Sequence, residues 1–166
     1  MFDLLKSQQQ AEQRFVRTSK RRRRSDAGRS RLDRDVLDEL RAQILGIERP
    51  PLVAIRRRLA DWCALRGLRP PARATVYNAL LRVPGHAYPV PSLPRHVQKA
   101  LYNLGPDAEV PGHQLAFYCF NYGSLAAVSY AAGLPWIDLY QAAHLRGWRP
   151  RSRGLLQAVL HSRGIS

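Results

Sequence analysis

Residues 59–82 contain two helix-forming segments separated by a short breaker, and this pattern constrains the fold more than any other feature. The first segment reads Leu-Ala-Asp-Trp-Cys-Ala-Leu-Arg-Gly-Leu, and the second reads Ala-Arg-Ala-Thr-Val-Tyr-Asn-Ala-Leu-Leu-Arg. Gly67 favours the end of a helix, and Pro70 and Pro71 prevent that helix from continuing. Two short helices joined in this way have the outline of a helix-turn-helix, so the sequence predicts a fold of short packed helices.

The chain is strongly basic, which narrows the classes of partner. It has 27 Lys and Arg residues against 12 Asp and Glu residues, a formal net charge of +15. Most of the basic residues are arginine, whose planar guanidinium pairs with phosphate and guanine through two hydrogen bonds. The codon usage of a GC-rich genome also enriches arginine. Beyond Glu109 the only acidic residue is Asp138. This asymmetry favours a polyanionic partner, namely DNA, RNA or an anionic membrane.

The chain divides into three regions by charge and by hydrophobic pattern. Residues 1–31 form a basic arm that we expect to be flexible, because the cations from Lys20 to Arg24 repel one another. Residues 32–104 form the expected helix-turn-helix domain, and residues 105–166 form a second, helix-turn-helix-like domain. The hydrophobic fraction of 45% is sufficient for a core.

Apolar residues at three- and four-residue spacing predict that most of the chain is helical. The expected helices are 32–47, 52–66, 71–83, 94–104 and 152–162. Ser30 and Asp33 provide a start signal for the first of them. Residues 84–91 cannot be helical and have the length and position of a short β-wing, although their three prolines make them a poor strand. Residues 115–120 are either a buried strand or the start of a core helix. The predicted fold class is mainly α, with a helix-turn-helix, a β-wing and minor β structure.

The second half of the chain repeats the outline of the first. Residues 125–134 and 135–143 have apolar, glycine and proline positions like those of residues 59–82, with a turn three residues shorter. Ser129 and Gly133 stand four residues apart, where two crossing helices need small residues. We therefore expect two helix-turn-helix units in tandem.

The second unit has two possible roles. As a DNA-reading unit, residues 124–146 would place Tyr140 and Gln141 in the positions that Tyr77 and Asn78 hold in the first unit.

The other possible role is that of an interface. Residues 124–162 would then bind a second copy of the chain or another protein, with Trp136 and Leu139 as exposed anchors.

The expected DNA contacts are basic, amide and hydroxyl side chains. We expect the helix over residues 71–83 to read base edges, and the basic arm and the arginines around Trp148 to contact phosphates. The candidate DNA-binding residues are Arg21, Arg22, Arg23, Arg24, Arg56, Arg57, Arg69, Arg73, Thr75, Tyr77, Asn78, Arg82, Tyr140, Gln141, His144, Arg146, Arg149, Arg151 and Arg153.

Residues 52–83 resemble the helix-turn-helix that DDE-type transposases and phage-type integrases carry ahead of their catalytic core. The matching residues are Leu59, Trp62, Cys63, Gly67, Leu68, Pro70, Pro71, Thr75 and Val76. This resemblance covers about a fifth of the chain and implies duplex-DNA binding by the helix at 71–83. The resemblance does not extend to catalysis. Such a nuclease needs three spaced carboxylates, and beyond Glu109 only Asp138 could supply one. The paired arrangement is also similar to small repressors and antitoxin-type regulators.

Other functional classes lack their sequence signals. Cys63 and Cys119 lie in apolar stretches and are interpreted as reduced core residues. The five histidines have no metal-ligand spacing, so a metal or histidine-based site would require two of them to converge in space. There is no P-loop, nucleophile elbow or dinucleotide motif. We expect no enzymatic activity, no metal and no cofactor. No apolar run reaches the length of a membrane span.

These observations predict a sequence-specific double-stranded DNA-binding protein. Its expected role is that of a transcriptional repressor, an autoregulator or an accessory factor of a mobile element, in the cytoplasm of a bacterium or in a phage and associated with the nucleoid. The alternatives are an RNA-binding protein and an antitoxin-like adaptor that binds a protein through its C-terminal half.

Overall fold

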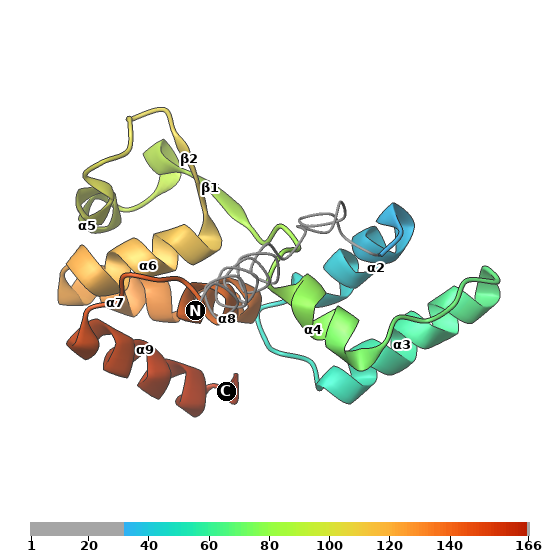
Figure 1. Ribbon diagram of the computed structural model, residues 1–166. Helices are drawn as coiled ribbons and strands as arrows, with labels where there is room; N and C mark the ends of the chain where they lie inside the picture. The colour runs from blue at the N-terminus through green and yellow to red at the C-terminus, as the bar shows by residue number, and fades with distance from the viewer. Residues whose placement is uncertain (1–31, 166) are drawn as a thin grey trace, which may run out of the picture. The chain divides into compact units, whose positions relative to one another are not determined.

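The computed structural model describes residues 32–165, and this part forms eight α-helices, two short 3-10 helices and one two-stranded sheet (Figure 1). The α-helices are α2 (Arg34–Ile44), α3 (Leu52–Leu65), α4 (Arg73–Leu80), α5 (Arg95–Gln98), α6 (Gly112–Tyr122), α7 (Leu125–Ala132), α8 (Trp136–Ala143) and α9 (Pro150–Ser162). The remaining elements are β1 (Ala87–Pro89), η1 (Val90–Ser92), η2 (Lys99–Leu101) and β2 (Glu109–Pro111). The mainly α class with minor β structure is confirmed. The expected basic arm, residues 1–31, lies outside the described residues.

The start of α2 follows a local sequence signal. The side chain of Asp33 accepts a hydrogen bond from the backbone N–H of Asp35 at 3.2 Å, which satisfies one of the free donors of the first helical turn. Ser30, the other residue of the expected start signal, lies outside the described residues.

The end of α3 is fixed by a glycine, and a long connection follows. Gly67 has a φ of 65°, in the left-handed region that favours glycine. The N–H of Leu68 then bonds the carbonyl of Cys63 at 2.9 Å and closes the helix end. The connection to α4 spans seven residues, 66–72, whereas the connection from α7 to α8 spans three, 133–135. Only the second has the usual length of a helix-turn-helix turn, so tandem units are not confirmed.

Helix α6 organises the core of the C-terminal half. It packs against α7, α8, α9, η2 and β2. At its end, Gly123 allows α7 to approach closely, because a Cβ atom there would overlap the carbonyl of Cys119 and lie 2.7 Å from the Cβ of Ala127. The expected crossing at Ser129 and Gly133 is wrong, since both residues are exposed and Ala127 is buried instead.

The sheet joins distant parts of the chain. Strand β1 pairs antiparallel with β2, with Tyr88 opposite Val110, and η1, α5 and η2 lie between the two strands in sequence. The segment expected as a β-wing therefore contains a strand, but not one half of a short hairpin. The two strands of the sheet lie on either side of the boundary expected between residues 104 and 105, and the described residues, 32–165, all belong to one compact unit. Residues 115–120 lie in α6, so the helical alternative is confirmed.

The end of α9 connects two loops. Arg163 Nη1 donates to the carbonyls of Ala132 and Leu134 at 2.8 and 2.6 Å, and its Nη2 donates to the carbonyl of Ile47 at 3.0 Å. These carbonyls lie at or beyond helix ends, where backbone acceptors lack helical donors. One guanidinium therefore fixes the α7–α8 turn against the loop that follows α2.

Candidate nucleic-acid interface

Helix α4 has one buried face and one exposed face. Val76, Ala79 and Leu80 are buried and recur at three- and four-residue spacing, which defines a single side of a helix. The exposed residues on or directly after α4 are Arg73, Ala74, Asn78, Leu81 and Arg82, and the half-buried ones are Thr75 and Tyr77. A helix with a solvent-facing side of this composition suits the width and hydrogen-bonding groups of a major groove.

Gln141 of α8 holds the C-terminal end of α4. Its side chain is buried, and Nε2 donates to the carbonyls of Leu80 and Val83, each at 2.8 Å. The last carbonyls of a helix have no donor within the helix. The Gln141 amide supplies two such donors and thereby fixes the direction in which the exposed face of α4 points.

Two pairs of polar side chains flank the exposed face of α4. Arg73 Nη2 donates to the hydroxyl of Tyr77 at 3.3 Å, and the Arg73 guanidinium lies 5.5 Å from the centre of the Tyr77 ring. Asn78 and Arg82 are also one turn apart and lie on the other edge of this face. Ala74 lies between the two pairs and leaves space for a close approach of the helix backbone.

The surroundings of α4 are basic. Arg56 and Arg57 are exposed on α3, and Arg69 is exposed in the connection between α3 and α4. No acidic residue occurs between Asp61 and Asp107. The predicted contacts from Arg69 to Arg82 therefore lie in a stretch of chain without carboxylates, whose charge attracts phosphate, and Arg56 and Arg57 precede this stretch on α3.

Helix α8 has no free face with which to read DNA. Its buried residues are Trp136, Ile137, Asp138, Leu139, Gln141 and Ala142. The expectation that Gln141 reads a base edge is corrected by this placement, because its amide is buried and bonded to the end of α4. The interface alternative with Trp136 and Leu139 as exposed anchors is wrong, since both side chains are part of the core.

Tyr140 and His144 lie at the edge of α8. Their ring centres are 4.8 Å apart, and His144 Nδ1 lies 2.8 Å from the carbonyl of Tyr140. Burial raises the pKa of the Tyr140 phenol, Arg49 lowers it, and Tyr77 raises it further. The interaction with Tyr77 brings one predicted contact of the second half near the exposed face of α4.

The predicted arginines in the α8–α9 connection and in the first turn of α9 are exposed but not equivalent. The backbone N–H of Arg149 donates to Asn121 Oδ1 and its Nη1 donates to the carbonyl of Asn121, both at 3.1 Å. Arg146, Arg151 and Arg153 are exposed on either side of it. Arg149 is therefore fixed against the end of α6.

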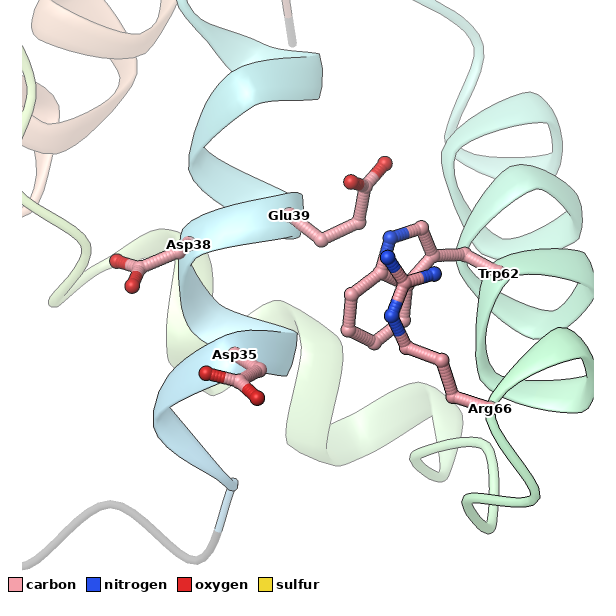
Figure 2. A pocket seen from close by; sticks show the side chains of 5 residues that line it. All are labelled: Asp35, Asp38, Glu39, Trp62 and Arg66. Carbon is pink, nitrogen blue, oxygen red and sulfur yellow. The ribbon is translucent and has the colours of Figure 1, made fainter.

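An open pocket of about 350 Å³ lies between α2 and α3 (Figure 2). Its lining residues are Asp35, Asp38, Glu39, Trp62 and Arg66. The Arg66 guanidinium lies 4.0 Å from the centre of the Trp62 ring, and Figure 2 shows the side chain of Glu39 extending from α2 toward α3. The three carboxylates repel phosphate, so the basic surface of α3 and α4 does not continue across this face of α2.

Two histidines converge on the buried Asp138. Its Oδ1 accepts a hydrogen bond from the backbone N–H of His86 at 3.2 Å, and its Oδ2 lies 3.0 Å from His86 Nδ1. Burial lowers the pKa of His113, and the nearby Asp138 raises it. Within residues 32–165, no group of three histidine, cysteine or carboxylate side chains could hold a metal ion. The cluster connects the segment before β1 to α8.

A cluster of tyrosines that includes Tyr102, Tyr118 and Tyr122 was not predicted from the sequence. The four-residue spacing of Tyr118 and Tyr122 places them on one face only if the segment is a helix, and the sequence left residues 115–120 as either a strand or a helix.

No helix in the described part of the chain has the length and hydropathy needed to cross a membrane. Comparison of the sequence with protein-family models and curated proteins, and of the structure with solved structures, gave no match.

Proposed function

We propose that this protein binds double-stranded DNA in a sequence-specific manner through α4. The observation that carries the proposal is the division of α4 into a buried apolar face and an exposed face with Arg73, Asn78 and Arg82. A recognition helix needs both properties, because one side must be anchored while the other reaches base edges.

Each exposed side chain has a role in this proposal. The side-chain amide of Asn78 pairs with adenine, with Nδ2 as the donor and Oδ1 as the acceptor, and Arg82 pairs with guanine or with phosphate. Arg73 is oriented by its hydrogen bond to Tyr77. Ala74 and Leu81 contribute apolar contacts of the kind that recognise the thymine methyl group.

Phosphate contacts come from outside α4. Arg56, Arg57 and Arg69 extend the basic surface next to it. The basic arm adds Arg21 to Arg24, whose contribution is electrostatic and independent of sequence.

The biological role that we propose is that of a repressor, an autoregulator or a mobile-element accessory factor. The resemblance of residues 52–83 to the DNA-binding part of transposases and integrases supports this role.

The test is a selection of bound sequences from random duplex DNA, followed by affinity measurements on the selected and on scrambled duplexes. Asn78→Ala should reduce the affinity for the selected site about five- to a hundredfold and leave the scrambled duplex unchanged. Gln114→Ala, which removes an exposed amide from α6, serves as the matched control and should change neither affinity.

Two outcomes would overturn the proposal. The first is a selection that yields no consensus sequence. The second is that the Asn78→Ala and Arg73→Ala variants both bind the selected site as tightly as the unmodified protein does.

A further inference from the structure

A group of tyrosines from two distant segments meets at the surface. Tyr102 directly follows η2, and Tyr118 and Tyr122 lie one turn apart on α6. The rings of Tyr102 and Tyr122 meet edge to face with centres 5.6 Å apart, and those of Tyr118 and Tyr122 are 6.0 Å apart. Tyr102 is 70% exposed and Tyr122 is 39% exposed. Large aromatic surface is therefore presented to solvent rather than used in the core.

Polar contacts hold the rings of Tyr118 and Tyr122 in place, and the ring of Tyr102 packs against that of Tyr122. Asn103 Nδ2 donates to the hydroxyl of Tyr118 at 2.7 Å. The Arg149 guanidinium lies 4.5 Å from the centre of the Tyr122 ring, and its Nη1 is also bonded to the carbonyl of Asn121. Because side chains that are already fixed lose little conformational entropy on binding, this arrangement is prepared for a ligand.

The inner part of the aromatic group has a structural role. Phe117 and Trp148 meet with ring centres 4.9 Å apart, and Trp148 Nε1 donates to the carbonyl of Ala142 at 3.0 Å. These contacts connect α6 to the loop that precedes α9. Core packing therefore accounts for Trp148 and Phe117, but it does not account for the exposure of Tyr102 and Tyr122.

The charge around the tyrosines favours an anionic partner. Arg149 touches Tyr122 directly, and Arg146 and Arg151 are exposed close to it in sequence. From Val110 to Ile165 the only acidic side chain is that of Asp138, which is fully buried. An extended anion can therefore pass Tyr122 along α6 and the start of α9, two helices that pack against each other, without meeting an exposed carboxylate from this segment. The exposed acids nearest in sequence to Tyr102 are Asp107 and Glu109, in the stretch that leads to β2.

We propose that Tyr102, Tyr122 and Arg149 form a stacking platform for the unpaired bases of single-stranded nucleic acid. Bases would stack on the exposed tyrosine rings, and the neighbouring arginines would contact the phosphates between them. The platform lies on α6, η2 and the start of α9, and it does not depend on the proposed role of α4.

Single strands fit this surface better than duplex DNA does. The faces of the bases are hidden within a duplex and are available for stacking only when the strand is unpaired. DNA and RNA present the same rings and phosphates, so the platform chemistry is common to both.

The experiment measures binding of the full chain to a fluorescent 20-nucleotide oligothymidylate, to an oligouridylate of the same length and to a mixed-sequence duplex. Tyr102→Ala and Tyr122→Leu should each weaken single-strand binding about five- to a hundredfold. Tyr122→Phe keeps the ring and should bind as the unmodified protein does. Ile47→Ala removes an apolar side chain of similar exposure from another surface and should have no effect. Comparison of the two oligonucleotides shows whether DNA or RNA is preferred.

A second readout locates the contact directly. Irradiation of a complex with an oligonucleotide that contains 5-iodouracil should produce crosslinks at Tyr102 or Tyr122, identified by mass spectrometry. Asn78→Ala should leave single-strand binding unchanged, so failure of this proposal can be distinguished from failure of the proposed function. Three results would each overturn the proposal: unchanged affinity in Tyr102→Ala and Tyr122→Leu, crosslinks confined to other surfaces, or no single-strand binding at all. The last of these results would leave the tyrosines as a protein-docking surface.

Discussion

His86 Nδ1 lies 3.0 Å from the carboxylate Oδ2 of Asp138, in a site where Asp138 is fully buried. The same carboxylate accepts a hydrogen bond from the backbone N–H of His86, and its presence raises the pKa of Tyr88 in addition to the effect of burial. Burial itself raises the pKa of Asp138, against the opposing effect of His86. A single buried side chain of α8 thus holds the chain between α4 and β1.

Gly112 should not tolerate a side chain. A Cβ atom at this position would overlap the carboxylate of Asp138, which is fully buried and already accepts a hydrogen bond from the backbone N–H of His86. We expect Gly112→Ala to lower the free energy of unfolding, measured by urea denaturation, by about 1–3 kcal/mol. The matched control is Gly154→Ala in α9, where no atom lies within 4 Å of the added methyl group. Because alanine is more favourable than glycine in a helix interior, Gly154→Ala should raise the free energy of unfolding by about 0.5–1 kcal/mol. Equal effects of the two substitutions would contradict the close packing at Asp138.

Acid should destabilise the protein through His113. Burial lowers the pKa of this imidazole from its usual value of 6.5, and its Nδ1 has no hydrogen-bond partner. The unfolded chain therefore takes up a proton more readily than the folded protein does, so the free energy of unfolding falls as the pH drops below about 6.5. Between pH 7.5 and pH 5, His113→Phe should lose less unfolding free energy than the unmodified protein does, because the imidazole that resists protonation is gone. Some loss remains, because the other histidines are present in both proteins. Parallel stability curves for the two proteins over this range would refute the assignment.

Gln141 should be needed for stability. Gln141→Ala leaves the carbonyls of Leu80 and Val83 without their buried donor, which costs about 1–3 kcal/mol of unfolding free energy. Gln157→Ala removes an exposed amide from α9 and should change stability by less than about 0.5 kcal/mol. If Gln141 instead contributes mainly to DNA binding, its substitution will reduce affinity and leave the denaturation midpoint unchanged.

The basic arm should contribute affinity without specificity. Replacement of Arg21 to Arg24 by glutamine should weaken binding to all duplexes alike, and each lost phosphate contact should reduce the slope of log affinity against log salt by about 0.9. The measurement is binding to the selected and the scrambled duplex over a range of salt concentrations. A loss confined to the selected duplex would show that the arm reads sequence.

Much of the helical fold could be predicted from local sequence. Apolar spacing and the breakers around Gly67 located α3 and α4 to within a few residues. These signals depend on interactions between residues that are close in the chain, namely capping, the restricted dihedrals of proline and the periodicity of a buried face.

The environment of α8 could not be predicted in this way. Tyr140 and Gln141 match Tyr77 and Asn78 by position, but α8 is covered by α6 and α9, and this depends on contacts between distant residues. Gln141 therefore lies in the core, where its amide bonds the end of α4. A polar residue on a helix looks the same in sequence whether it faces solvent or satisfies a buried carbonyl.

The bond between Gln141 and Leu80 joins residues that are 61 positions apart in the chain. A protein is synthesised from its N-terminus, so α4 leaves the ribosome long before the residue that holds its end. The local helix can form early, but its final orientation is set only after α8 has been made, because contacts between distant residues form late. Intermediates of synthesis thus contain an α4 that is not yet anchored, and the exposed face of this helix becomes fixed near the end of translation.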